Sequence, residues 1–406
     1  YILPPADAVV DPRQEGCEYP FKGLCGAAVA YKLVEALCEA NGQDVADLDY
    51  LLENVAIATV ADVMDLTEEN RILVKQGLEM LKRTSNLGLR ALIQCIGLEG
   101  KKIQAYHIGF ILAPCLNASG KLDTAKRALA LLRAKTEREA DMLAGDLKAL
   151  NESRRDMTDR VVDEAMAKVE QTDIRGDKVL VIYLPDCHES LAGLVAGRVR
   201  ENYYRPVFVL TDSEGGVKGS GRSIESYSMY EELTGCGDLL TKFGGHPMAA
   251  GLSLPEENVD KFREKINACA NLTEDDLIPK IKIDIPMPAA YADAGLIREF
   301  AVLEPFGKAN IKPQFADKNL SITKAFVVGK NQNVLRLTAA GEAVSAVYFG
   351  DIEAFKAYYA EKYGSAEVEK AFRGQINKLR IMIVYYPEIN EYNGVESVQV
   401  IIRNYQ

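Results

Sequence analysis

The sequence of 406 residues lacks the patterns that mark several large classes of protein. Its eight cysteines form no Cys-x-x-Cys pair or zinc spacing, and neither His-Glu-x-x-His nor Gly-x-Ser-x-Gly occurs. The longest apolar run, near residues 108–116, is interrupted by Pro114 and falls well short of the ~20 residues of a membrane span. Zinc enzymes, serine hydrolases with that motif and membrane-spanning proteins are therefore excluded, and we expect a cytoplasmic protein with reduced cysteines.

The charge balance is acidic. Lys and Arg number 48 against 59 Asp and Glu, a formal net charge of −11, while 48% of the residues are hydrophobic. This composition argues against a surface wholly coated by nucleic acid, but surface charges act over only about 10 Å, so a local basic groove remains open. At roughly 150 residues per domain, the length predicts two or three globular domains.

The first third of the chain is predicted to complete an α/β domain. The β-branched run at 55–60 has the length of a strand and stops at Asp62, and apolar spacing predicts helices at 68–81 and 123–132. The segment 136–171 is rich in charged residues, Ala and Leu, which predicts one long connecting helix.

A second α/β unit and a β-rich unit follow. Strand 178–184, helix 190–201 and strand 206–210 have the spacing of a β-α-β unit with a parallel strand pair. Beyond residue 280 the strands alternate around one helix, 352–363, which favours a small barrel of the OB type. The strands expected there are 335–337, 344–349, 379–385 and 398–402.

A carboxylate follows the first expected strand. Residues 59–62, Thr-Val-Ala-Asp, place Asp62 where α/β sheets present groups to ligands, and its oxygens suit a hard Mg²⁺ or Mn²⁺ ion. The alternative for Asp62 is a helix cap or a surface ion pair. Asp65, three residues before Glu68, is typical of a helix start.

Two segments have the composition of phosphate sites. Residues 117–121, Asn-Ala-Ser-Gly-Lys, precede an expected helix within a stretch of net charge +4, and backbone amides at a helix start bind phosphate. Residues 215–223, Gly-Gly-Val-Lys-Gly-Ser-Gly-Arg-Ser, combine glycines that let the backbone approach a phosphate with donors from Ser220 and Arg222. A solvated helix face and a hairpin turn are the respective alternatives.

One of only three histidines lies among small residues. Residues 243–251, Phe-Gly-Gly-His-Pro-Met-Ala-Ala-Gly, surround His246 with close backbone packing, which suits a substrate contact, although a structural histidine is the alternative. His107 and His188 are interpreted as structural or helix-end residues.

The C-terminal part combines aromatic and basic residues, as a platform for stacked bases does, although tyrosines in a barrel core are the alternative. They are Tyr358, Tyr359, Tyr363, Tyr385, Tyr386, Tyr392, Lys330, Arg336, Lys378 and Arg380.

Taken in order, these motifs resemble the RecJ family of single-stranded-DNA-specific exonucleases in the DHH phosphoesterase superfamily, with the chain starting just after that family's Asp-His-His motif. The matching segments are 3–12, 19–26, 59–66, 113–122, 188–196, 219–223, 243–251 and 303–310.

The resemblance implies an α/β multidomain fold. Residues 1–135 would be the C-terminal part of the DHH domain, 136–172 a connecting helix, 173–275 the DHH-associated substrate-binding domain and 276–406 an OB-fold β-barrel.

The resemblance also implies 5′ to 3′ hydrolysis of single-stranded DNA to mononucleotides in repair and recombination, by water activated between two Mn²⁺ or Mg²⁺ ions. Asp62 would be a catalytic metal ligand. The nucleic-acid-binding residues would be Asn117, Lys121, Ser220, Arg222, Gly244, Gly245 and His246. The implied partners are single-stranded DNA, a single-strand-binding protein and a helicase, with no membrane.

Departures from the family pattern keep alternatives open. No Asp-His-His motif or upstream aspartate motif is present, Tyr1 is not a methionine, and Cys115, Lys121 and Asp65 replace two arginines and a proline. We expect the C-terminal major part of a longer enzyme. A single-stranded DNA-binding module without catalysis and a DHH phosphodiesterase of short oligonucleotides are the alternatives.

Overall fold

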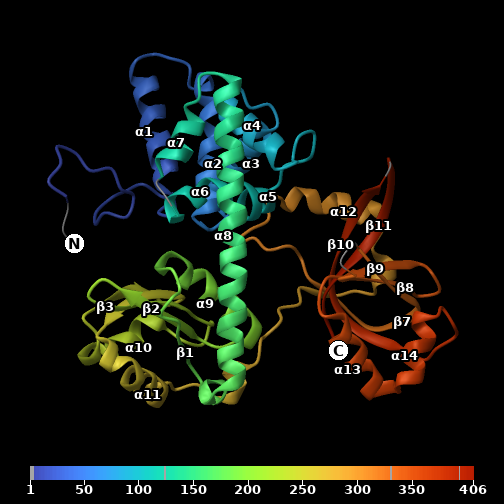
Figure 1. Ribbon diagram of the computed structural model, residues 1–406. Helices are drawn as coiled ribbons and strands as arrows, with labels where there is room; N and C mark the ends of the chain where they lie inside the picture. Colours follow the sequence, from blue (N-terminus) through green and yellow to red (C-terminus); the bar gives the residue numbers. More distant parts are fainter. Residues whose placement is uncertain (1–3, 123–124, 330–331, 393) are drawn as a thin grey trace. The chain divides into compact units, whose positions relative to one another are not determined.

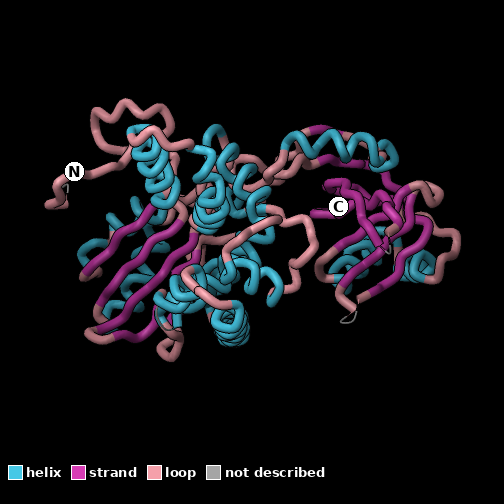
Figure 2. The backbone as a smooth tube through the Cα atoms, turned by 90° about the horizontal axis from the view of Figure 1, so that it is seen from above, coloured by secondary structure: helices cyan, strands magenta, loops and turns pink. Residues whose placement is uncertain are grey.

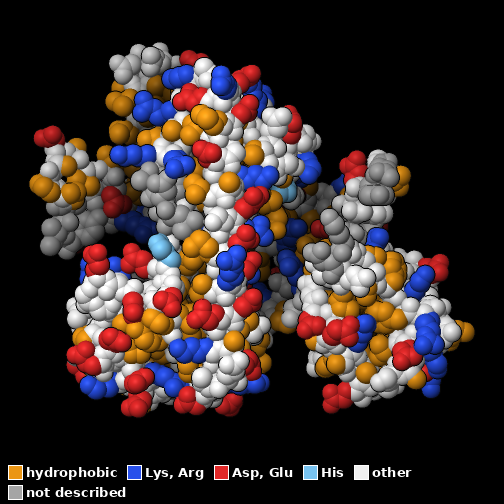
Figure 3. Space-filling view, in the orientation of Figure 1, with side chains coloured by type: hydrophobic (Ala, Val, Ile, Leu, Met, Phe, Trp, Pro, Cys, Tyr) orange, Lys and Arg blue, Asp and Glu red, His pale blue; other side chains and the backbone are white. Residues whose placement is uncertain are grey.

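The computed structural model (Figure 1) describes residues 4–122, 125–329, 332–392 and 394–406. It divides into two compact units. Unit 1 comprises Tyr1–Arg83, Ile103–Gly109 and Ile281–Gln406, and unit 2 comprises Thr84–Lys102 and Phe110–Lys280. All eight cysteines are free thiols, and no helix in the described ranges is long and apolar enough to span a membrane. Acidic and basic side chains are interspersed over the visible surface (Figure 3).

The N-terminal part of unit 1 is helical. Its helices are α1 (Gly26–Ala40), the 3-10 helix η1 (Val45–Leu51), α2 (Leu52–Ala61), α3 (Glu68–Leu81) and the short α5 (Ala105–His107). The prediction for 68–81 is confirmed, but the strand expected at 55–60 is wrong, because these residues form most of α2. Side chains around almost the whole circumference of α2 are buried, so the apolar run has no helical period and reads like a buried strand.

The close contact between α2 and α3 depends on Gly77. A Cβ atom there would lie 2.5 Å from the Cβ of Ala56 and would also meet the carbonyl oxygen of Leu52. The glycine that weakens the helical pattern of α3 in the sequence therefore lets the two helices approach.

The turn that follows α2 is tied to a segment some 240 positions later within unit 1. The Leu66 amide donates to the Lys308 carbonyl (2.8 Å), and the Lys308 ammonium pairs with Asp65 (2.9 Å). Arg71 donates to the carbonyl of Val302 (2.7 Å). Asp65 is therefore not the helix-start residue that was expected, since Thr67 precedes α3 and the Asp65 carboxylate faces Lys308.

The C-terminal part of unit 1 is a closed barrel. Its sheet has the order β10-β11-β9-β8-β7-β6, and the additional pairing of β10 with β7 closes the ring, as an OB barrel requires. The elements are β6 (Ile285–Pro286), α12 (Ala294–Glu299), β7 (Phe315–Val328), β8 (Val334–Ala339), β9 (Val344–Tyr348), α13 (Ile352–Tyr363), α14 (Ser365–Phe372), β10 (Arg380–Tyr392) and β11 (Val395–Tyr405).

All four expected strands and the helix 352–363 are confirmed, but one expected helix was too few, since α12 and α14 are also present. The hydrophobic face of α14 supplies Val368 and Ala371 to the barrel core.

The tyrosines of the barrel divide into core and surface. Tyr359 and Tyr385 are fully buried, as the core alternative predicted. Tyr386 is different, because the Lys312 ammonium lies 4.3 Å and the Arg403 guanidinium 5.0 Å from its ring centre. Lys330, and the side chain of Tyr392, lie outside the described residues.

Unit 2 contains the long helix predicted for 136–171, observed as α8 (Glu137–Gln171) with the Thr136 side chain capping its first turn. The other helices are α4 (Leu87–Cys95), α6 (Ala113–Leu122), α7 (Lys126–Leu132), α9 (Glu189–Tyr203), α10 (Met229–Gly235) and α11 (Val259–Cys269). The helix expected at 123–132 is shorter, and residues 123–124 lie outside the described residues.

A five-stranded sheet completes unit 2, with helices on both of its faces (Figure 2). Its order is β1-β2-β3-β5-β4, and the predicted parallel pairing of β1 with β2 is confirmed. One face packs on α8 and α9, and the other on α10 and α11. The strands are β1 (Leu180–Tyr183), β2 (Val207–Ser213), β3 (Gly216–Arg222), β4 (Lys242–His246) and β5 (Ala249–Leu254).

The packing at Gly77 gives a stability test. Gly77→Ala should lower the protection of α2 and α3 amides against hydrogen exchange by about 1–3 kcal/mol, because the added methyl group overpacks the contact. Gly145→Ala, on α8 where nothing lies within 4 Å of the new Cβ, is the matched control and should raise protection by up to about 1 kcal/mol. Equal effects of the two substitutions would show that the helix contact does not require glycine.

Candidate nucleic-acid interface

The two faces of β3 differ in character. Val217 and its alternate neighbours Gly219 and Gly221 face the core formed with α10 and α11, while Ser220 and Arg222 face α9. A Cβ on Gly221 would lie 2.5 Å from the Met229 sulfur. The glycines at 215–223 were expected to let the backbone approach a phosphate, but residues 216–222 form the strand β3, whose inward glycines make room for core side chains, and the hairpin-turn alternative holds at 214–215 between β2 and β3.

Arg222 brings a positive charge to this face beside α9. Its guanidinium donates to the Gly221 carbonyl (2.8 Å) and the Ser220 hydroxyl (3.3 Å), and no carboxylate in the described part of the chain pairs with it. Burial lowers the pKa of Arg222 from its usual value, and nearby Arg200 lowers it further. A partly buried guanidinium beside another one, without a counter-ion, has the charge and the free donors that attract an anion.

Helix α9 leaves room for these donors. A Cβ on Gly193 would lie 2.8 Å from both the Ser220 hydroxyl oxygen and an Arg222 nitrogen. Gly193 and Arg200 are seven residues apart and therefore share a face of α9, and Arg200 donates to the Ser223 carbonyl (3.4 Å). Sequence reasoning missed both residues. The available signal was that Gly193 and Arg200 are spaced to share one face of the helix in the β-α-β unit that precedes the Ser220–Arg222 segment.

The predicted helix-end histidines are confirmed. The His188 Nδ1 accepts from the Ser190 amide (3.2 Å) at the start of α9, and the His107 Nδ1 accepts from the Gln104 amide (2.9 Å) at α5.

The small-residue segment 243–251 forms β4, a turn and β5. The register places His246 opposite Ala249, and Ala249 opposite Arg222, so His246 and Arg222 belong to the same row of the sheet. Gly245 has φ +154°, and a Cβ there would lie 2.5 Å from the Ala250 Cα. Gly244 and the His246 side chain are exposed.

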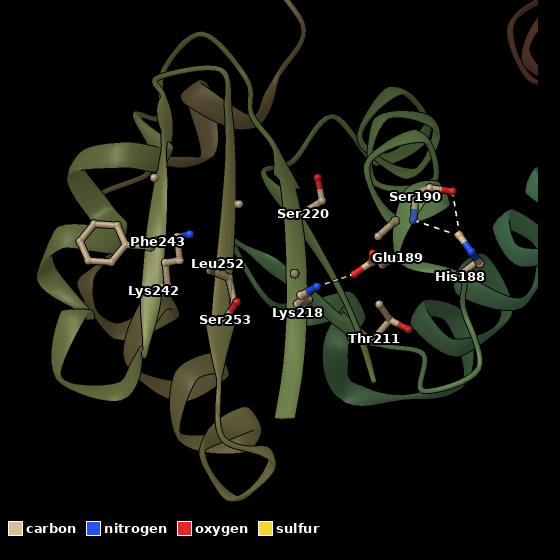
Figure 4. A pocket seen from close by; sticks show the side chains of 14 residues that line it. His188, Glu189, Ser190, Thr211, Lys218, Ser220, Lys242, Phe243, Leu252 and Ser253 are labelled. Atoms are coloured by element: carbon tan, nitrogen blue, oxygen red, sulfur yellow. Dashed lines mark hydrogen bonds and ion pairs between the residues drawn. The ribbon is translucent and has the colours of Figure 1, made fainter. Parts of the chain in front are cut away.

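A cavity of about 710 Å³ opens beside this row. Figure 4 shows Ser220, Lys218, Lys242 and Ser253 from the sheet and Glu189 from the start of α9 around it. Lys218 pairs with Glu189 (2.7 Å) and lowers the pKa of that carboxyl group.

The phosphate site expected at the start of a helix near 117–121 is wrong in its local structure. These residues lie inside α6, which begins at Ala113, so their amides can bond to carbonyls within the helix. Asn117 is exposed, and Lys121 follows one turn later, although its side chain lies outside the described residues.

Sequence reasoning also missed Arg154 of α8. Cys115 is buried and accepts from the Asn151 amide group (3.5 Å), whose oxygen accepts from Arg154 (2.8 Å). Burial raises the pKa of the Cys115 thiol and lowers that of Arg154. Arg154 therefore brings a guanidinium group next to Cys115. In the RecJ pattern that the sequence resembles, the position of Cys115 is occupied by an arginine.

Asp62 belongs to unit 1, while the other candidates belong to unit 2. Asp62 follows α2 rather than a strand, and its side chain is exposed. No group of three or more potential metal-ligating residues exists among those described, so Asp62 offers one ligand and these residues do not make a metal site by themselves.

Comparison with known proteins agrees with this architecture. The family model described as the DHHA1 domain matches residues 176–272, and that of the RecJ OB domain matches residues 283–404. The α/β multidomain fold with a DHH-associated unit and an OB barrel is therefore confirmed.

Several relatives match nearly the whole chain. The single-stranded-DNA-specific exonuclease RecJ of Bacillus subtilis is 35% identical, covering 99% of this chain and 49% of the relative. That of Escherichia coli is 31% identical, covering 99% of this chain and 70% of the relative. The chain thus spans about half the length of the Bacillus relative.

The solved structures agree. A crystal structure of Thermus thermophilus RecJ with Mg²⁺ matches with a TM-score of 0.78 at 27% identity, covering 96% of this chain and 57% of that one. A structure titled exonuclease RecJ bound to manganese matches with a TM-score of 0.56 at 33% identity, covering 68% of each chain. Together with the serine and arginine donors on one face of β3 and the OB barrel, these matches show that the chain belongs to the RecJ family of single-stranded-DNA-specific exonucleases.

Proposed function

We propose that this chain is the substrate-holding part of a metal-dependent exonuclease that hydrolyses single-stranded DNA from its 5′ end to mononucleotides, in repair and recombination. The observation that carries the proposal is the Arg222 guanidinium, partly buried beside Arg200 and without a carboxylate partner among the described residues. A phosphate would supply the counter-ion and the hydrogen-bond acceptors that this guanidinium group lacks.

The chemistry of these donors fits a terminal 5′ phosphate. Arg222 can donate two parallel bonds to phosphate oxygens, the Ser220 hydroxyl on the neighbouring row adds a third donor, and exposed His246 lies on the same row as Arg222. Lys121 and Asn117, one turn apart on α6, would contact the backbone. On the barrel, Lys312 and Arg403, which lie against the ring of Tyr386, supply two cations for the phosphates of the strand beyond.

Mn²⁺ or Mg²⁺ would supply the activated water, and Asp62 would contribute one carboxylate ligand. Relatives that match this chain have solved structures titled with these ions. Two ions need more ligands than Asp62, so the complete cage requires residues beyond those described.

A binding module without catalysis is the second candidate, and the same lack of a metal-ligand group among the described residues favours it. A phosphodiesterase of short oligonucleotides fits less well, because a ligand of a few nucleotides does not require the OB barrel.

The remaining proposals concern context. We infer domain boundaries at 1–135, 136–172, 173–275 and 276–406, a cytoplasmic location, and a single-strand-binding protein and a helicase as partners of the longer enzyme.

Gly193 provides a test of the phosphate site. Gly193→Ala should weaken binding of 5′-phosphorylated single-stranded DNA in chelator by about tenfold or more, because the new Cβ displaces Ser220 and Arg222, and a charged hydrogen bond contributes about 1.5–3 kcal/mol. Gly197→Ala, on the same helix with open space at its Cβ, is the matched control. Fluorescence anisotropy measures both. Unchanged affinity in Gly193→Ala would contradict the site.

The metal role of Asp62 is tested in the longest form of the protein that releases nucleotides. Asp62→Asn should reduce Mn²⁺-dependent mononucleotide release by about 100-fold or more, since a neutral amide is a poor ligand, while DNA affinity in chelator stays the same. Asp163→Asn, an exposed carboxylate on α8, is the control. Tight binding without chelator-sensitive release in any form would favour the binding module.

A further inference from the structure

The face of the unit 2 sheet that carries Ser220 and Arg222 continues along the strands beyond these two residues. The register aligns three rows across strands β3, β5 and β4. The rows are Arg222, Ala249 and His246, then Ser220, Gly251 and Gly244, and then Lys218, Ser253 and Lys242. Since alternate residues of a strand share a face, all three rows lie on the face that α9 covers near β2. The cavity is lined by the second and third rows.

Two glycines, Gly244 and Gly251, form the floor of the cavity, and packing does not explain why these positions lack side chains. A Cβ on Gly244 would meet nothing within 4 Å, and one on Gly251 only a carbonyl oxygen at 3.8 Å. Neither glycine has a positive φ. Because neither the backbone nor the core requires glycine at these positions, their effect is to leave the cavity open between the second row and the third.

The third row is cationic and available. Lys242 is exposed and pairs with no carboxylate of the described chain. Lys218 pairs with Glu189, but both side chains are about half exposed, and such pairs contribute little and exchange readily for another anion. The Ser253 hydroxyl lies between the two lysines in the register, so two ammonium groups and a hydroxyl group border one end of the cavity (Figure 4).

We propose that Lys218, Ser253 and Lys242 form a second phosphate subsite, which receives the phosphate group adjoining the one held by Ser220 and Arg222. The proposal rests on the proposed function of Ser220 and Arg222, the first phosphate site. Along β3 the third row lies two residues, about 6.8 Å, beyond Ser220 and four residues, about 14 Å, beyond Arg222, and the long lysine and arginine side chains can shorten these separations.

Two sources supply a phosphate at that place. One is the β-phosphate of a strand whose 5′ end carries a di- or triphosphate. The other is the terminal phosphate of a strand that has advanced by one nucleotide, so that its next backbone phosphate occupies the site of Ser220 and Arg222 and a dinucleotide is released.

The test compares otherwise identical short single strands that carry a 5′-hydroxyl, 5′-monophosphate or 5′-triphosphate, bound to the full chain in chelator and followed by anisotropy. We expect the triphosphate end to bind at least threefold more tightly than the monophosphate end. Lys242→Gln should remove this gain, and Lys218→Gln should reduce it. Lys261→Gln, an exposed lysine on α11, is the matched control and should keep it.

A second arm measures product sizes from the monophosphate strand with the longest active form of the enzyme. Dinucleotides that decrease in Lys242→Gln, without a triphosphate preference, would identify the adjoining phosphate as a backbone phosphate and still support the subsite. Absence of both effects, or a triphosphate preference that Lys242→Gln keeps, would overturn the subsite. Equal affinity for hydroxyl and monophosphate ends would instead contradict the phosphate site of Ser220 and Arg222 and the proposed function.

Discussion

The alternation of side chains along β3 is the constraint on which the candidate interface depends. The strand lies in the middle of a sheet with helices on both faces, so one face must fit a packed core while the other presents donors. Glycines at 219 and 221 satisfy the first requirement because Leu252 and Met229 occupy the space of their side chains. Ser220 and Arg222 can then face α9 without distorting the strand. A shift of one residue in register would bury the guanidinium in the apolar core.

The sequence predicts a secondary-structure element well where a pattern within the element agrees with signals at its two ends. Helix α3, the long helix α8 and the β-α-β unit were predicted close to their observed bounds, α3 from its apolar period, α8 from its composition and the β-α-β unit from the spacing of its elements. The OB barrel was predicted from alternating strands, although α14 was not, since its short apolar face packs on a core that only the closed barrel creates.

The errors have one physical origin, which is that tertiary contact overrides the local signal. Residues 55–60 are β-branched yet helical because α3 covers them, and residues 117–121 carry a turn-like composition yet lie inside α6. The pairing of Asp65 with Lys308 was equally hidden, since nothing local connects positions so far apart in the chain. For the candidate site, the sequence predicted the phosphate-binding residue types. The supporting residues Gly193, Arg200 and Arg154 could be identified only from the folded structure.

The two sheets of the protein end differently. In the barrel, the pairing of β7 with β10 closes the ring, with the two-residue β6 added beside β7, whereas in unit 2 the strand β4 has a neighbour on one side only among the described strands. An unprotected edge of this kind invites another chain to add a strand, and repeated addition leads to aggregates. Lys242 at the start of β4 and the sharp backbone of Gly245 near its end both discourage such pairing. The strand that borders the cavity thus also protects the open edge of its sheet against the addition of a strand from another molecule.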